Sequence, residues 1–276
     1  MTRAAVIGHP VSHSLSPAIH RVGFAELGVD WTYEAIDCEA DGLGALFSEV
    51  RRGGFGGLSV TMPLKEAVIA HLDVVDEDAR ALDAVNCVSV SNGRLRGHNT
   101  DGDGCCDAIE AATGGSVADE HVVLLGAGGT ARSVALAMVR RRAKVHVVNR
   151  TEANAAALVE MVVNRHGANA QIAVGVDADI RTASILVNAT SVGMNSVGSP
   201  CDASLLHPGL TVLDAVYSPL RTTLLRDAEE AGARTVDGLW MLIHQARHQQ
   251  RLWFGRMASA ETMRAESERE LAGRGK

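Results

Sequence analysis

Short apolar runs alternate with amphipathic segments along the first hundred residues. Apolar residues recur at helical spacing between Pro17 and Leu27, and Ser16 is placed as the N-cap of this helix. Consecutive apolar residues bounded by glycine or polar residues predict buried strands instead. Strands are predicted in this way over residues 4–7, 31–36, 58–60, 86–90 and 94–97, and helices over residues 43–51, 65–72 and 77–82.

The pattern becomes more regular after Asn99-Thr100-Asp101. A helix, a strand, a glycine turn, a second helix and a second strand follow one another, which is the order of a βαβ unit. The predicted elements are a helix over 104–113, a strand over 121–125, a turn over 126–129, a helix over 130–141, strands over 144–148, 171–174, 185–188 and 211–214, and helices over 223–231 and 239–257. The charge-rich tail 259–276 is predicted to be a solvated or frayed helix.

This alternation predicts an α/β protein of two domains. Residues 1–103 together with 239–276 are expected to form an α/β substrate domain with a mostly parallel sheet. Residues 104–238 are expected to form a Rossmann-type dinucleotide-binding domain between those two segments.

Composition and charge exclude several classes of partner. The 276 residues are 46% hydrophobic and 21% charged, with a net charge of −7, so we expect no general attraction to nucleic acid or to anionic membranes. No apolar run approaches the length of a membrane span, and the N-terminal run is too short for a signal peptide. The five cysteines include no CxxC pair, which favours reduced thiols in a cytoplasm and no metal site. A homodimer is compatible with the sequence, but nothing in it fixes the oligomeric state.

The segment 126–131 reads Gly-Ala-Gly-Gly-Thr-Ala and fits G-x-G-x-x-G/A. Gly126 permits a tight turn, Gly128 lets the backbone approach a pyrophosphate, and Ala131 lets the helix pack closely on the sheet. The N–H groups at the helix start then face the phosphates. We therefore predict a dinucleotide site formed by Gly126, Ala127, Gly128, Gly129, Thr130 and Ala131.

The second strand of this unit is followed by Asn149, Arg150 and Thr151. An NAD site usually has an acidic residue here for the ribose 2′-hydroxyl, whereas a guanidinium suits a 2′-phosphate. The sequence therefore favours NADP over NAD, although Arg150 could also be an ordinary exposed arginine.

Four polar clusters stand where predicted strands end in the first hundred residues. Their hydroxyls, amides and one lysine suit a ligand with several hydroxyls and a carboxylate. Each cluster also has a simpler explanation on physical grounds, as a helix cap, a turn or a solvated side chain. The clusters are residues 13–16, 59–65, 84–86 and 99–101.

Taken in order, these clusters resemble the signatures of the shikimate dehydrogenase family. Nine family patterns match segments of this chain, which begin at Gly8, Val60, Ala84, Asn99, Gly126, Asn149, Asn188, Asp214 and Asp237. In the same order, the patterns are G-x-P-x-x-H-S-x-S-P, V-T-x-P-x-K, A-V-N, N-T-D-x-x-G, G-A-G-G-x-x-R, N-R-T, N-A-T-S-x-G-M, D-x-x-Y-x-P and D-G-x-x-M-L-x-x-Q-A. The similarity covers about residues 5 to 250.

The resemblance implies a role for each matching residue. Lys65 and Asp101 would be the catalytic pair of an NADP-dependent enzyme that reduces 3-dehydroshikimate to shikimate in aromatic amino acid biosynthesis. The substrate site would be lined by Ser14, Ser16, Ser59, Thr61, Asn86, Tyr217 and Gln245. Beyond the glycine turn and residues 149–151, the cofactor site would include Thr190, Met194, Val216 and Gly238.

Some positions depart from the family pattern. Ser59 stands where the family often has Asn, and Asn154 replaces a common second cation, which weakens the preference for NADP. Two alternatives therefore stay open: an NAD-linked dehydrogenase of quinate, shikimate or an amino-shikimate, and a catalytically silent ligand sensor on the same fold.

Overall fold

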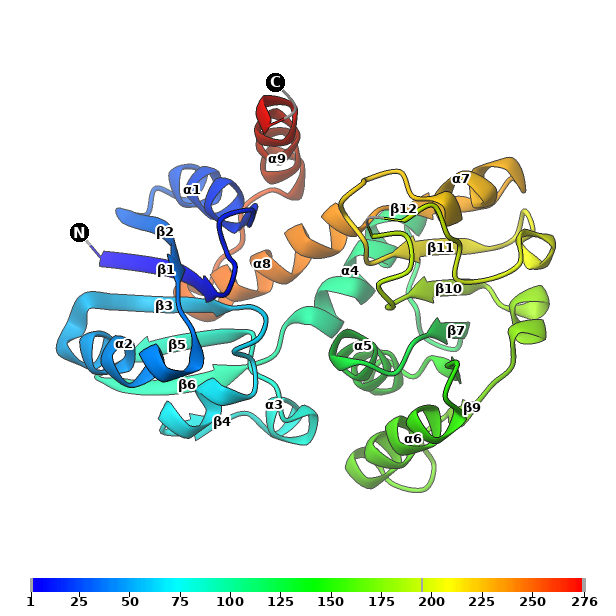
Figure 1. Ribbon diagram of the computed structural model, residues 1–276, viewed down its shortest axis with the longest axis horizontal. Coiled ribbons are helices and arrows are strands. Elements are labelled where there is room, and N and C mark those ends of the chain that lie inside the picture. The colour runs from blue at the N-terminus through cyan, green and yellow to red at the C-terminus, as the bar shows by residue number, and fades with distance from the viewer. Residues whose placement is uncertain (1, 195, 275–276) are drawn as a thin grey trace. The chain divides into compact units, whose positions relative to one another are not determined.

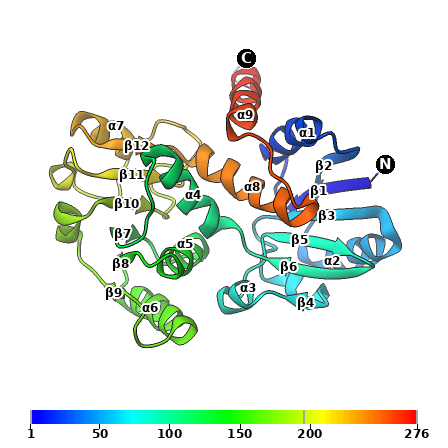
Figure 2. The ribbon, with the colours of Figure 1, turned by 180° about the vertical axis from the view of Figure 1, so that it is seen from behind.

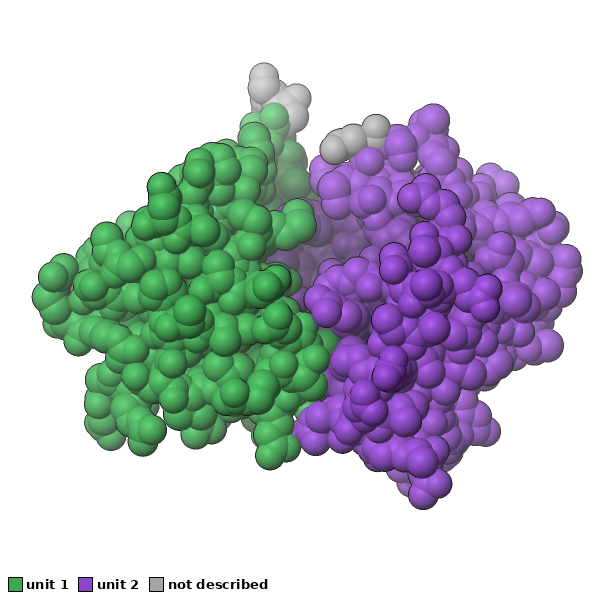
Figure 3. Space-filling model, turned by 60° about the horizontal axis from the view of Figure 1, so that its bottom comes forward, with its two compact units in different colours: residues 1–100, 245–276 green, residues 101–244 purple. Residues whose placement is uncertain are grey.

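The computed structural model describes residues 2–194 and 196–274. The chain divides into two compact units, residues 1–100 with 245–276 and residues 101–244, which Figure 3 colours separately. The predicted domain boundaries, after residues 103 and 238, differ because one helix begins already at Asp101 and another continues across residue 244. None of the helices in the described residues is long and apolar enough to span a membrane.

Unit 1 contains a six-stranded sheet in the order β2-β1-β3-β5-β6-β4. Five strands run in one direction, and only β5 is antiparallel to its neighbours. The elements are β1 (Thr2–Gly8), α1 (Ser16–Leu27), β2 (Trp31–Asp37), α2 (Leu43–Glu49), β3 (Phe55–Val60), β4 (Val74–Val75), α3 (Glu77–Leu82), β5 (Cys87–Ser91), β6 (Arg94–His98) and α9 (Ala260–Arg274), with the second half of α8 (Gly238–Phe254).

Unit 2 contains a fully parallel sheet in the order β12-β11-β10-β7-β8-β9. This is the doubly wound strand order, with its switch point between β7 and β10. The elements, visible in Figures 1 and 2, are α4 (Asp101–Thr113), β7 (His121–Leu125), α5 (Gly129–Arg140), β8 (Lys144–Val148), α6 (Glu152–His166), β9 (Ile172–Val174), β10 (Ile185–Asn188), β11 (Thr211–Asp214), α7 (Thr223–Glu230), β12 (Arg234–Val236) and the first half of α8. The predicted fold class is confirmed in both units.

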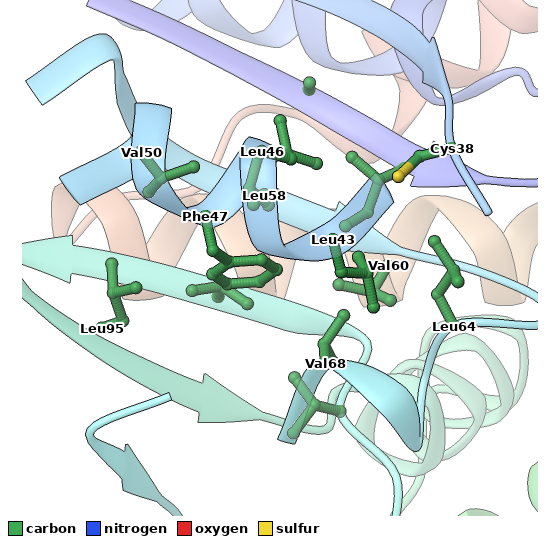
Figure 4. Close-up of a cluster of buried hydrophobic side chains, with 14 of the residues drawn as sticks. Cys38, Leu43, Leu46, Phe47, Val50, Leu58, Val60, Leu64, Val68 and Leu95 are labelled. Atoms are coloured by element: carbon green, nitrogen blue, oxygen red, sulfur yellow. The ribbon is translucent and has the colours of Figure 1, made fainter. Parts of the chain in front are cut away.

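Side-chain alternation along the strands of unit 1 separates an apolar face from a face that carries polar residues. Leu58 and Val60 of β3 point into a core beneath α2, together with Phe47 and Leu43 (Figure 4). Ser59 lies between them in the sequence, so its side chain points to the opposite face of the sheet. The buried Ser59 hydroxyl therefore lies on that opposite face, together with the buried polar side chains that it contacts.

Several predicted elements differ from the observed ones. Residues 65–72 were predicted as a helix, but only a short 3-10 turn forms, at Ala67–His71, and it buries Val68 in the core of unit 1. Ser16 does not cap α1: Leu15 is the N-cap residue, and the Ser14 hydroxyl accepts a hydrogen bond from the Ser16 N–H. The tail forms a helix as predicted, α9, but this helix is not simply solvated, because it packs against α1 through buried Met263 and Ser267.

The close approach of α4 to α5 depends on Gly102, in the first turn of α4. A β-carbon added here would lie against the Ser133 carbonyl oxygen and within 2.7 Å of the Ala137 Cβ. We expect Gly102→Ala to lower the free energy of unfolding by about 1–3 kcal/mol, because α4 would have to move away from α5. Urea titration would measure this change. Gly115→Ala, whose new β-carbon would have only Thr113 Oγ1 nearby at 3.8 Å, should be nearly neutral, and equal losses in both variants would contradict the packing argument.

Candidate active site

The glycine turn of unit 2 has the geometry of a phosphate-binding turn. Gly126 has φ 109°, a conformation that side chains rarely adopt, and it connects β7 to the turn before α5. Gly128 is the N-cap residue of α5 and provides no side chain to cap the helix. Ala131 is fully buried where α5 packs on the sheet. The first N–H groups of α5 are thus presented at the carboxyl end of the strands, where an anionic group binds favourably.

A pocket of about 590 Å³ opens beside this turn within unit 2. Asn149, Arg150, Thr151 and Thr190 line it, as the sequence predicted for a cofactor site. Arg150 is exposed, and no hydrogen bond or ion pair holds its guanidinium among the residues that the structure describes. Because the guanidinium stands in the wall of the pocket without such a partner, it is suited to bind a phosphate that enters there.

The pocket is also lined by residues that were not predicted as site residues, although the sequence had marked Asn154 as a departure from the family pattern. They are Leu125, Val148, Asn154, Asp177, Ser191, Val192, Ser199 and Pro200. Asp177 matters most, because it places a carboxylate in the same pocket as Arg150. It begins the 3-10 helix that follows β9, and no local motif marks it.

A buried pair of polar side chains holds the loops after β10 and β11. Asn188 Nδ2 donates to Asp214 Oδ1 at 2.9 Å, and its Oδ1 accepts from the Thr190 N–H and hydroxyl. The Val216 N–H also donates to Asp214 Oδ1, at 3.0 Å. Burial raises the pKa of the Asp214 carboxyl above its ordinary value, although these hydrogen bonds and one from Thr222 oppose the shift. The pair therefore fixes the backbone at two predicted cofactor residues, Thr190 and Val216.

The remaining cofactor predictions fall in different environments. Met194 is 45% exposed at the end of the described segment before residue 195. Gly238 begins α8, where a β-carbon would meet the Ala215 and Val216 carbonyl oxygens at 2.5 and 2.7 Å. This close approach explains why glycine is needed there, but neither residue lines the 590 Å³ pocket.

Three predicted substrate residues meet in one buried cluster of unit 1. Ser59, Asn86 and Gln245 are each less than a tenth exposed. Asn86 Nδ2 donates to Gln245 Oε1 at 3.3 Å, and the Ser59 hydroxyl donates to Gln249 Oε1. Gln249 in turn donates to Gln245 Oε1 at 2.7 Å. The cluster thus joins strand β3, the start of β5 and one face of α8.

Tyr33, Thr100 and Gln249 belong to this cluster but were not predicted as site residues. The Tyr33 hydroxyl donates to Ser59 Oγ at 2.6 Å, and burial raises the pKa of this phenol far above its ordinary value, so it stays a neutral donor. The Thr100 N–H donates to Asn86 Oδ1 at 2.8 Å. A signal for Gln249 was available, since residues four apart on a helix share a face and Gln245 was already a candidate.

Ser14 and Thr61 lie in two neighbouring loops of unit 1, and Ser16 is the first residue of α1, which follows the first of these loops. The His9 N–H donates to the Met62 carbonyl at 3.0 Å, which links the loop after β1 to the turn after β3. Ser14 and Thr61 are partly exposed and Ser16 is buried. These hydroxyls therefore stand at the carboxyl ends of two adjacent parallel strands, where ligands of α/β folds bind.

Lys65 lies in the turn after β3, and its carbonyl accepts from the Val85 N–H at 2.8 Å. This bond places the lysine backbone beside Asn86. Asp101 begins α4 in unit 2, and Tyr217 follows β11 in the same unit. The predicted pairing of Lys65 with Asp101, and the contribution of Tyr217 to the substrate site, stay predictions.

The doubly wound sheet, the glycine turn with its adjacent pocket and the second α/β unit define a protein of the dinucleotide-binding oxidoreductase class. Family models match residues 6–88 (shikimate dehydrogenase substrate binding domain), 109–198 (shikimate / quinate 5-dehydrogenase) and 238–266 (shikimate 5′-dehydrogenase C-terminal domain). The chain belongs to the shikimate dehydrogenase family, which confirms the resemblance stated from its motifs.

Curated relatives match this chain over nearly its whole length and theirs. An NADP(+) shikimate dehydrogenase of Thermococcus kodakarensis is 42% identical over 250 residues, which cover 91% of this chain and 90% of that protein. The counterpart of Thermus thermophilus is 42% identical over 272 residues, covering 98% and 99%.

Solved structures match over nearly the whole chain. Shikimate 5-dehydrogenase of Thermus thermophilus, in complex with NADP(H) and shikimate, gives a TM-score of 0.88 at 40% identity and covers 98% of this chain and 99% of its own. Quinate dehydrogenase of Corynebacterium glutamicum, in complex with NAD, gives 0.86 at 34% identity and covers 96% and 98%.

Proposed function

We propose that this protein is an NADP-dependent shikimate dehydrogenase that reversibly reduces 3-dehydroshikimate to shikimate in aromatic amino acid biosynthesis. The observation that carries the proposal is the buried cluster of Ser59, Asn86 and Gln245, assembled next to Lys65 in a chain of this family. Amide and hydroxyl groups fixed in this way suit a ligand with several hydroxyl groups.

The substrate is held by residues that match the substrate motifs of the family. Ser14 and Ser16 bind its carboxylate through their hydroxyls, and Thr61, Asn86 and Gln245 bind its ring hydroxyls. Ser59 supports this set through Gln249. Tyr217 completes the substrate site.

NADP fits the residues of unit 2. The N–H groups at the start of α5 suit its pyrophosphate, and the pocket lined by Asn149, Arg150 and Thr151 suits its 2′-phosphate. Thr190, Met194, Val216 and Gly238 contribute to the rest of the cofactor site. When bound, NADPH supplies the hydride that reduces the ketone.

Lys65 and Asp101 carry the chemistry on the protein side. Negative charge grows on the ketone oxygen as its carbon is reduced, and the Lys65 ammonium stabilises that oxygen and gives it a proton. Asp101 accepts a hydrogen bond from a neighbouring ring hydroxyl and orients the lysine. In the reverse direction Lys65 takes the proton back.

The five cysteines are all free thiols, and four of them are buried. Reduced thiols are typical of a cytoplasmic protein, and we place this enzyme there. A homodimer stays a prediction from the sequence.

The neutral Asn154 and the Asp177 carboxylate in the cofactor pocket favour one alternative, an NAD-linked enzyme that acts on quinate or shikimate. Initial rates measured with shikimate and quinate, each with NADP and with NAD, separate the proposals. We expect shikimate with NADP to give the highest kcat/KM. A higher value for quinate with NAD would replace the proposal by the alternative, and ligand binding by calorimetry without any turnover would identify a sensor.

A further inference from the structure

The C-terminal helix α9 reaches the loop that carries the proposed substrate residue Ser14 and leads into a second one, Ser16. This serine loop, residues 9–15, connects β1 to α1 and places Ser14 two residues before Ser16, where α1 begins. Arg274, the last residue of α9, donates from Nη1 to the His13 carbonyl at 2.7 Å and from Nη2 to the Ser14 carbonyl at 3.2 Å. One guanidinium thus holds two successive carbonyls of the serine loop.

Helix α9 provides a fixed support for this contact. Met263, Ser267, Glu270 and Arg274 recur at helical spacing on one face, and the first two are fully buried. A β-carbon at Gly23 of α1 would lie against Gln250 Nε2 of α8 and 3.0 Å from the Met263 Cε, so α1 packs closely on both α8 and α9 there. The N–H of Ser259, just before α9, donates to Glu26 Oε1 at 2.8 Å. Helices α1 and α9 lie side by side in Figures 1 and 2.

The guanidinium itself is held in orientation. Its Nε donates to Glu270 Oε1, one turn earlier on α9, at 3.2 Å. The planar guanidinium of arginine can donate three hydrogen bonds in different directions at once, and a lysine ammonium cannot reproduce this geometry.

The serine loop borders an open groove on its α9 side. A groove of about 500 Å³ opens between α1 and α9, and Ser12, Ser14, Glu270 and Arg274 are among the residues that line it. Because the groove is open, side-chain packing from α9 cannot hold the loop there, and the Arg274 hydrogen bonds bridge this space. They fix the peptide groups next to Ser14, whose hydroxyl also accepts the Ser16 N–H at 3.2 Å.

The geometry points to Arg274 as a positioning residue of the substrate site. It acts through the serine loop, by holding the Ser14 and Ser16 hydroxyls where they meet the substrate carboxylate. This inference rests on the proposed function for the identity of the substrate, but the restraint on the loop can be measured without any substrate.

The test compares Arg274→Ala and Arg274→Lys with the wild type. Arg269→Ala is the matched control, because Arg269 lies on the same helix, is exposed and pairs with Glu266 rather than with the loop. We expect Arg274→Ala to raise the KM for shikimate by about three- to tenfold, the effect of losing one or two hydrogen bonds, with the KM for NADP and kcat unchanged. Arg274→Lys should recover part of the loss, and Arg269→Ala should match the wild type.

A second readout is hydrogen exchange of the free protein over residues 9–17, where the Ser14 and Ser16 N–H groups are hydrogen-bonded. Exchange should be faster in Arg274→Ala than in the wild type or in Arg269→Ala. An unchanged shikimate KM in an active Arg274→Ala protein, an equal rise in the NADP KM, or unchanged exchange in this segment would overturn the inference. A wild type without shikimate turnover would overturn the proposed function instead, and the exchange experiment would still decide whether Arg274 restrains the loop.

Discussion

Lys65→Ala is expected to lower kcat for shikimate oxidation by at least about a hundredfold, the lower end of what a general acid or base contributes. The lysine lies in the turn after β3, and its carbonyl bond to the Val85 N–H fixes the backbone beside Asn86. Removing the ammonium leaves the charge on the reacting oxygen without its stabilising cation and its proton donor. The KM for shikimate should rise less than kcat falls, because the hydroxyl and amide groups of the cluster remain.

Stopped-flow or steady-state absorbance of the nicotinamide measures this effect, and two further variants sharpen it. Lys65→Arg keeps a positive charge but cannot release a proton near neutral pH, so it should remain slow if proton transfer is essential. Lys144→Ala removes an exposed lysine at the start of β8 and should leave turnover unchanged. Turnover close to that of the wild type in Lys65→Ala would remove this residue from the chemistry.

Arg150→Ala is expected to raise the KM for NADPH by about ten- to a hundredfold, the range of a charge-assisted hydrogen bond to a phosphate. The KM for NADH should change little, because NADH has no 2′-phosphate for the guanidinium to bind. Steady-state rates with both cofactors measure the difference. Arg226→Ala, an exposed arginine on α7 in the same unit, serves as the control. Equal effects of Arg150→Ala on both cofactors would mean that this arginine does not recognise the phosphate.

A second experiment adds a cation to this pocket instead of removing one. Asn154 is suited to it, because it lines the same pocket as Arg150 from the start of α6. Asn154→Arg adds a cation to a pocket that also holds the Asp177 carboxylate, and it should lower the KM for NADPH relative to NADH. An unchanged ratio would show that the Asn154 side chain does not face the bound phosphate.

The glycine turn and the strands of unit 2 could be predicted from the sequence because their signals are local. Gly126 needs its backbone conformation at one position, and the run from Val122 to Leu125 is apolar because both faces of a parallel sheet are covered. The helix predicted over residues 65–72 was wrong: a short 3-10 turn forms at Ala67–His71, and it buries Val68 in the core of unit 1, a tertiary contact that the local helical pattern does not contain. Helix α9 was missed as a packed element because its charged residues dominate the composition, while its buried stripe consists of only a few positions.

The sequence by itself determined the class of fold, the glycine turn, the family and the residue types available for chemistry, because periodicity and short motifs depend on neighbours along the chain. Only the tertiary structure decided that Ser59 meets Gln249 across 190 positions, that Asp177 shares a pocket with Arg150, and that Arg274 reaches the His13 carbonyl. These contacts depend on strand register and on which helix faces pack together. Such choices are made by burial over the whole unit, and no local segment of the sequence contains them.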